Sequence, residues 1–226
     1  QAQHLKFATW DGSSWSVPQN LTLPADSNGE GRVTLAGCLS TNPACPAGGE
    51  VTVVWVRDAI GSLAARQFRL FYASYTSNAW SAPLAVDPTS TATDAEPSVA
   101  YRIDGTAVVA WVRDGDRSLS TLNDRQIAQR QLTPGSPVIV ESSLPSGAAE
   151  PSLAINSAGE LLLAYTVAND PLAFIGDQRQ LHSAQRTCGG QGCTWNDQAL
   201  TDANGRPVHA ESPTLILNGS GQAQIA

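Results

Sequence analysis

The stretch "AEPSVAYRIDGTAVVAWVRDGD" (95–116) decides the fold, because the chain repeats it. A close copy, "AEPSLAINSAGELLLAYTVAND", occupies 149–170, and a third, "AESPTLILNGSGQAQIA", occupies 210–226. Each copy opens with an acidic residue beside a proline or serine and then passes through a short turn rich in Gly, Asp or Asn. An apolar run follows the turn in the first two copies. This pattern is typical of a β-hairpin, and its recurrence indicates a repeat architecture.

A second half of the unit repeats as well. The segment 66–87, "RQFRLFYASYTSNAWSAPLAVD", matches 1–21, "QAQHLKFATWDGSSWSVPQNL". In this match Trp80 falls on Trp15, and Trp195 holds the same place in a third copy. The repeating unit therefore contains two hairpins rather than one.

Four short segments rich in Val, Ala, Leu and aromatic residues make up each unit, with turn residues between them. Glu96, Glu150 and Glu211 mark the same point in successive units, 54 and 61 residues apart. Four short strands at this period are typical of a β-propeller blade. We therefore predict an all-β fold, a β-propeller of four-stranded antiparallel blades. The first strand of each blade should line the channel, and the continuously apolar second strand should be buried on both faces.

The repeat divides the single predicted domain (1–226) into three full blades and two partial ones. Full blades are expected at about 28–87, 92–144 and 146–202, and partial blades at 1–23 and 205–226. Two arrangements stay open: the partial blades pair and close a four-bladed ring, or the chain is an arc of a larger propeller of about 4–8 blades. We favour the arc, because a strand that stops before its aromatic residue leaves backbone groups unpaired.

These blades resemble those of secreted bacterial propellers related to the sialidase superfamily, which carry the BNR repeat. The resemblance rests on "EPSVAYRIDGTAVVAWV" and on "WSAP" and "WSVP", and it covers nearly the whole chain at the level of the blade pattern. That family's Asp-box reads roughly Ser-x-Asp-x-Gly-x-x-Trp. The segment "TWDGSSW" (9–15) comes closest with one residue fewer, whereas 74–80 and 188–195 keep the Trp without the Asp. The resemblance implies the fold more than an activity.

The charge balance excludes several classes of partner. The chain has 13 Lys and Arg against 20 Asp and Glu, a formal net charge of −7, and Lys6 is its one lysine. No basic run exists that could track phosphates, so we expect no nucleic-acid partner. An acidic, Lys-poor surface is also unfavourable on anionic membranes. The longest apolar runs, "VTVVWV" and "ELLLAY", are too short to span a bilayer, so we expect no membrane insertion.

Four cysteines form two close pairs in loops rich in Gly, Pro and Asn. Cys38 and Cys45 enclose "CLSTNPAC", and Cys188 and Cys193 enclose "CGGQGC". The spacing suits disulfides better than a zinc site, and each bridge should stabilise the fold by at most about 2–3 kcal/mol. Disulfides persist in oxidising compartments, so the expected localisation is extracellular, periplasmic or the cell surface.

Glu96, Glu150 and Glu211 are the first candidate site. At the entrance of the inner strands they would lie around one rim of the channel, where carboxylate oxygens could hold a ligand or a cation, Ca²⁺ being the ion expected. The alternative is that each Glu caps the blade entry by accepting backbone N–H bonds. No other cofactor is expected.

Two further groups could contact an anion or a glycan. Arg57 and Arg113 both lie in "WVRD". The resemblance to sialidase-like enzymes implies an Arg cluster that grips the substrate carboxylate, a Tyr–Glu nucleophile pair and an Asp acid/base. Matching positions do not supply that set, so no catalytic residue is assigned. Aromatic residues near the outer turns could stack on sugars, although their recurrence in register favours packing between blades; they are Trp10, Trp15, Trp80 and Trp195.

The absence of a convergent catalytic set leads to the expected function. We expect a non-catalytic extracellular or cell-surface propeller that acts as a binding or structural module of a larger protein or assembly. Its partner would be a protein or a glycan, or other domains or subunits of that assembly. A glycan-binding lectin propeller and a fragment of a sialidase-like glycoside hydrolase are the alternatives.

Overall fold

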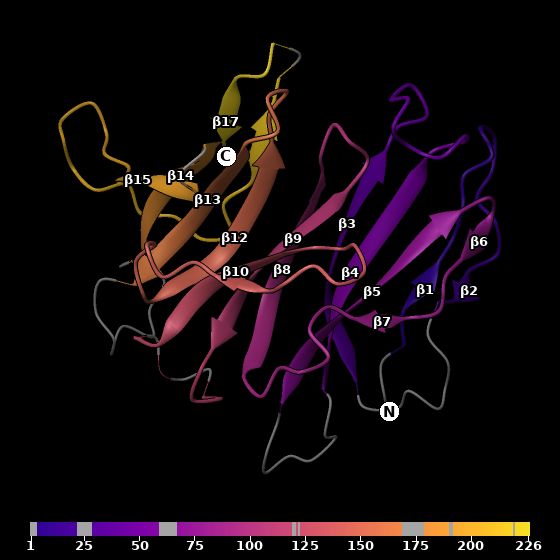
Figure 1. Cartoon of the computed structure of the whole chain (residues 1–226), viewed down its shortest axis with the longest axis horizontal. Helices are drawn as coiled ribbons and strands as arrows, with labels where there is room; N and C mark the ends of the chain where they lie inside the picture. Colours follow the sequence, from indigo (N-terminus) through magenta and orange to yellow (C-terminus); the bar gives the residue numbers. More distant parts are fainter. Residues whose placement is uncertain are drawn as a thin grey trace.

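The fold is built from β-strands. The computed structural model describes residues 4–21, 29–58, 67–118, 121, 123–168, 179–189, 192–218 and 220–226. Within these ranges the regular structure is strand, and no helix is long and apolar enough to cross a lipid bilayer. The sheets follow one another in chain order, from indigo at one side to yellow at the other (Figure 1).

Three antiparallel sheets form the body of the molecule, and we call them blades 1, 2 and 3. Blade 1 contains β3 (Glu30–Cys38), β4 (Glu50–Asp58), β5 (Phe68–Thr76) and β6 (Ala79–Trp80), with β7 (Leu84–Ala85) also paired to β5. Blade 2 contains β8 (Thr93–Tyr101), β9 (Ala107–Asp114), β10 (Arg125–Gln131) and β11 (Ile139–Val140). Blade 3 contains β12 (Ala148–Ile155), β13 (Leu161–Ala168), β14 (Arg179–Gly189) and β15 (Gly192–Ala199). Each blade runs from its first strand to its last without a crossover, as the repeat predicted.

Two short hairpins flank the blades. The first pairs β1 (Lys6–Phe7) with β2 (Gln19–Asn20), and the second pairs β16 (Leu215–Leu217) with β17 (Ala223–Ile225). Each hairpin is a separate two-stranded sheet. The pairing between them that would close a four-bladed ring is therefore not formed by the described residues.

The second strand of each blade is buried on both faces, as predicted. Val and other β-branched residues suit a pleated strand that packs on both sides. Trp55, Trp111 and Tyr165 hold the same position in β4, β9 and β13, and each is 0% exposed. Large aromatic side chains at one repeated place thus anchor the centre of every blade.

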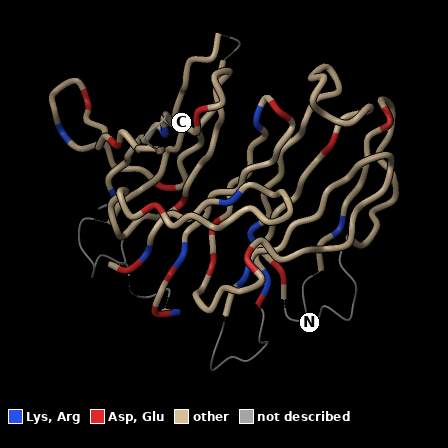
Figure 2. Tube along the Cα trace, viewed as in Figure 1, with Lys and Arg blue, Asp and Glu red and all other residues tan. Residues whose placement is uncertain are grey.

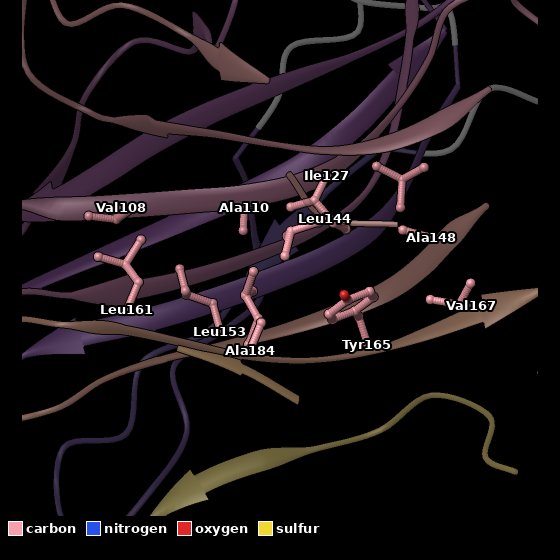
Figure 3. Packing of buried hydrophobic residues seen from close by; sticks show 12 residues of the cluster. Val108, Ala110, Ile127, Leu144, Ala148, Leu153, Leu161, Tyr165, Val167 and Ala184 are labelled. Carbon is pink, nitrogen blue, oxygen red and sulfur yellow. The ribbon is translucent and has the colours of Figure 1, made fainter. Parts of the chain in front are cut away.

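The largest core lies between blades 2 and 3 and does not belong to either blade alone. Ile127 and Leu144 come from blade 2 and its following turn, whereas Leu153 and Tyr165 come from blade 3 (Figure 3). Similar clusters join blade 1 to blade 2, and the first hairpin to blade 1. Stacking of neighbours supplies the apolar burial that a single blade lacks, as in other repeat architectures.

Both predicted disulfides are confirmed. Cys38 and Cys45 are bonded with their Cα atoms 5.8 Å apart, and Cys188 and Cys193 are bonded with their Cα atoms 4.0 Å apart. The first bridge closes the loop between β3 and β4, and the second closes the turn between β14 and β15. The side chain of Asn42, inside the first loop, donates a hydrogen bond to the carbonyl of Ile103 in the next blade, at 3.0 Å.

Candidate functional site at the propeller axis

The inner strands converge on a cavity at the axis. Segments from β3, β8 and β12 and the residues just before β16 line a cavity of about 390 Å³, a size typical of small-molecule sites. Each of the four contributes a three-residue stretch: 32–34, 96–98, 150–152 and 212–214. Many charged residues lie along the end of the blades where these inner strands begin (Figure 2).

The walls of this cavity carry repeated backbone strain. Arg32, Glu96, Glu150 and Ser212 have φ angles of 46°, 53°, 54° and 50°. Each angle lies in the left-handed region, which costs a residue with a Cβ about 1 kcal/mol or more. The strand registers shift at the first three of these positions, so a β-bulge holds each residue there. Strain that recurs around one cavity marks it as a candidate functional site.

Glu96 and Glu150 project from neighbouring blades into this arrangement. Oε2 of Glu96 accepts a hydrogen bond from the backbone N–H of Glu150 at 2.7 Å. Oε2 of Glu150 in turn accepts one from the N–H of Ser212 at 2.8 Å, and Nη1 of Arg179 lies 3.5 Å from it. These contacts agree with the alternative drawn from the sequence, in which each glutamate accepts hydrogen bonds from backbone N–H groups. Each carboxylate links its blade to the next and still borders the cavity.

Glu211 does not join this pair. The cavity is lined by Ser212, and Glu211 is exposed outside it. The stretch "ESPT" therefore aligns one residue later than the sequence comparison placed it, so that "SPT" matches "EPS". The expected ring of three carboxylates is instead a pair, Glu96 and Glu150, with Ser212 next in order.

Arg57 is held inside blade 1. Its Nη2 lies 2.7 Å from Oε1 of Glu30, whose side chain is completely buried, and its guanidinium stacks 4.3 Å from the centre of the Phe71 ring. In blade 3 the corresponding places are Ala148 and Val167, which face each other across the same ladder. The acid and the arginine are thus both absent from blade 3. This joint absence indicates an internal ion pair rather than a ligand contact.

Arg113 has the same role in blade 2 with two acids instead of one. Its Nε donates to Asp94 at 2.8 Å and its Nη2 donates to Asp87 at 2.7 Å. Asp94 also accepts a hydrogen bond from the indole N–H of Trp111 at 2.7 Å. Burial raises the pKa of Asp87, but hydrogen bonds from Arg113 and Thr89 outweigh it and leave that pKa below its ordinary value. Arg113 is therefore paired with these two buried carboxylates, and its contact with an anion stays a prediction.

The four tryptophans of the outer turns lie in different surroundings. Trp80 packs against the first hairpin and Trp195 against the core between blades 2 and 3, in agreement with packing between blades. Trp10 and Trp15 pair across a tight turn with ring centres 5.6 Å apart, and they are 52% and 68% exposed. Asp11 organises this turn by accepting bonds from the N–H groups of Ser13 and Ser14, both at 2.8 Å, which lowers its pKa. The "TWDGSSW" segment thus keeps an ordered turn despite its shortened motif.

A cluster of three carboxylates follows β9. One oxygen each of Asp114, Asp116 and Asp124 lies within 4.8 Å of the others. The loop's own groups already bond these oxygens, since the N–H of Ser118 donates to Asp116 at 2.7 Å and that of Asp116 donates to Asp124 at 2.9 Å. Asp114 is fully buried and lies 3.7 Å from Nε of Arg125. The sequence showed Asp114 and Asp116 around a glycine, but Asp124 joins them through the β9–β10 pairing.

Asp114 carries a testable pH dependence. Burial, with the nearby Asp116 and Asp124 carboxyl groups, raises its pKa from 3.8 to about 6. Because the folded state binds this proton more tightly, the contribution to stability is full below about pH 4 and is lost as the pH rises to about 6. Asp114→Asn should remove this loss and stabilise the protein at pH 7.5 by roughly 1–3 kcal/mol.

Urea unfolding at pH 4.5 and pH 7.5 measures this effect. Asp104→Asn is the control, because that exposed carboxyl has a pKa below its ordinary value. An Asp114→Asn variant whose stability changes with pH as the wild type does would contradict the assignment.

No protein-family model matches the sequence, and no curated protein matches it. Solved structures do. The chain is similar to an α-L-arabinanase of Penicillium chrysogenum solved with arabinobiose, at 12% identity and a TM-score of 0.64, over 100% of this chain and 67% of that one. It is also similar to a thermostable family-43 glycoside hydrolase, at 13% identity and a TM-score of 0.52, over 83% of this chain and 65% of that one. These similarities show the fold, a β-propeller. The chain spans about two thirds of the length of both.

These comparisons overturn the expected function. We expected a non-catalytic binding or structural module, whereas the similar solved structures are glycoside hydrolases. The absence of a sialidase-like catalytic set in the sequence was therefore the wrong criterion for expecting a non-catalytic module. The comparisons agree better with the hydrolase alternative, although they do not place the chain among the sialidases.

Proposed function

We propose that this propeller is a glycoside hydrolase whose substrate is a neutral polysaccharide bound at the axial cavity. The observation that carries the proposal is the placement of Glu96 and Glu150 on adjacent walls of one cavity, at strained positions 54 residues apart. Glycoside hydrolysis needs a pair of carboxyl groups that flank the scissile bond. Within the described residues these two glutamates are the carboxyl groups that line this cavity.

The contacts of the two glutamates suggest different roles. Glu150 accepts a hydrogen bond from Ser212 and lies beside Arg179, so it is held as an acceptor. We assign it the base or nucleophile, which attacks the anomeric carbon or activates water. We assign Glu96 the acid that protonates the departing oxygen, because its one described bond, at Oε2, leaves Oε1 for the substrate.

The lining favours an uncharged sugar. Among the described residues of the cavity wall Arg32 is the one cation, and beside the two glutamates the polar side chains are hydroxyls such as those of Ser98 and Ser152. Arg57 and Arg113 are bound to buried acids and cannot assemble a grip on a sugar carboxylate. The structural similarity to an arabinanase makes an arabinose-containing polysaccharide the first substrate to test.

The two disulfides support an extracellular setting for this activity. A polysaccharide is too large to enter a cell, so a secreted or surface location suits the substrate. In this proposal the glycan is the partner, and contacts with further domains or subunits remain a prediction.

The test is hydrolysis of a panel of glycans by the purified protein. We expect reducing sugar to be released from arabinan or another neutral polysaccharide and no cleavage of a sialoside. Release from the sialoside alone would contradict the substrate class. Inactivity on every neutral polysaccharide, by a correctly folded protein with both disulfides formed, would overturn the proposal.

A further inference from the structure

A second crevice lies away from the axis, between the first hairpin and the outer strands of blade 1. It encloses about 330 Å³ and is bordered by β1 and β2 on one side and by β5 and β6 on the other. None of its lining residues belongs to the inner strands that form the axial cavity. It is therefore a separate site on the outer part of the blades.

Three aromatic rings form one part of this crevice. The ring centre of Phe7 lies 5.6 Å from that of Trp80, and Tyr75 lies 5.1 Å from Trp80. All three side chains are partly exposed, and they come from both sides of the crevice. Packing between β1 and blade 1 thus fixes the rings, so no rearrangement is needed to present them.

Three amides form the polar part. Gln19 and Asn20 lie on β2 and Asn78 lies in the turn between β5 and β6, and all three are exposed. Amides donate and accept hydrogen bonds without charge. The described lining contains no Lys, Arg, Asp or Glu, so the crevice offers nothing to neutralise an ionised ligand.

We propose that this crevice is an accessory site for a neutral sugar unit, which stacks on the aromatic rings while its hydroxyls bond to the three amides. Aromatic rings and amides together suit a sugar, because the C–H faces of a sugar ring are apolar and its hydroxyl groups are polar. The site would hold a polysaccharide on the protein independently of the axial cavity. It stands apart from the proposed function, since binding here requires no hydrolysis.

The experiment is native gel electrophoresis with a polysaccharide in the gel, where binding slows migration. The probes are arabinan and xylan as neutral polymers and polygalacturonate as an acidic one. Every protein carries Glu150→Gln, so that no probe is consumed during the run. Expression in a bacterial host leaves Asn20, which lies in an Asn-Leu-Thr sequence, unglycosylated.

We expect a neutral polymer to retard the protein and Gln19→Ala/Asn20→Ala to weaken the binding by about 5–50-fold. The matched control is Asn196→Ala/Gln198→Ala, an exposed amide pair on β15 beside a crevice that has no aromatic lining. This control should bind as the parent does.

Three results would overturn the proposal: no retardation by either neutral polymer, equal retention of the Gln19→Ala/Asn20→Ala variant and its parent, or stronger retention by polygalacturonate. Hydrolysis by the protein without these substitutions is scored separately. The accessory site can therefore fail while the hydrolase proposal stands, and the reverse also holds.

Discussion

Glu150→Gln is expected to lower the kcat for glycan hydrolysis by about 10²–10⁴-fold, the usual contribution of a positioned acid–base group. Glutamine keeps an oxygen that can accept the hydrogen bond from Ser212, so the link between blade 3 and the second hairpin should survive. The amide can neither attack a sugar nor take a proton from water. The loss should therefore fall on kcat, with the melting temperature little changed.

Glu96→Gln should produce a loss of similar size, with a difference that identifies its role. A leaving group that departs easily, such as nitrophenol, does not need protonation, so an aryl glycoside should be cleaved with a much smaller loss. Glu211→Gln is the matched control, because this glutamate shares the sequence repeat but lies outside the cavity. Full activity of Glu150→Gln, or a comparable loss in Glu211→Gln, would remove the axial pair from the mechanism.

Arg113→Ala is expected to destabilise the fold by about 3–5 kcal/mol, the cost of leaving a buried charge without its partner. One guanidinium serves two carboxylates, and the side chains of Asp87 and Asp94 are 9% and 3% exposed. Without it the two acids lose their shared donor within the same closed space. Asp94 would keep its bond from Trp111, which cannot neutralise its charge.

Chemical unfolding of Arg113→Ala and Arg206→Ala measures this effect, since Arg206 is exposed and should change stability by less than about 0.5 kcal/mol. Arg113→Lys keeps the charge but loses the planar fork that reaches both acids, so its stability should fall between the wild type and Arg113→Ala. A loss below about 1 kcal/mol for Arg113→Ala would show that the pair contributes little. Arg113 would then again be a candidate for ligand contact.

Local pattern was enough to predict the blades. The apolar runs that contain Trp55 and Trp111 are each bounded by turn or charged residues, the pattern of a short buried strand, and the structure places them as buried second strands. The disulfides could be predicted in the same way, because cysteines only seven and five positions apart in the sequence come together without help from the rest of the chain. Such features depend on neighbours in sequence.

Which residue of the last repeat faces the axial cavity could not be predicted from the sequence in the same way. Glu211 and Ser212 are adjacent, and a shift of one residue exchanges the side chain that faces the cavity. The place of Ser212 at the cavity is held by a hydrogen bond from its backbone N–H to Glu150, 62 residues earlier. The arginines show the same limit, since "WVRD" reads alike whether its Arg faces a ligand or a buried acid on another strand.

The sequence by itself determined the strand content, the four-stranded unit, the two disulfides and the burial of the second strands, because these follow from hydrophobic pattern, turn chemistry and short loops. Tertiary structure alone decided that Glu96 and Glu150 share a cavity without Glu211, that Arg57 and Arg113 neutralise internal acids, and that Phe7, Tyr75 and Trp80 border one crevice with three amides. Each of these depends on side chains from different strands meeting across blade contacts. The spacing of residues along the sequence does not specify which side chains of different blades come into contact.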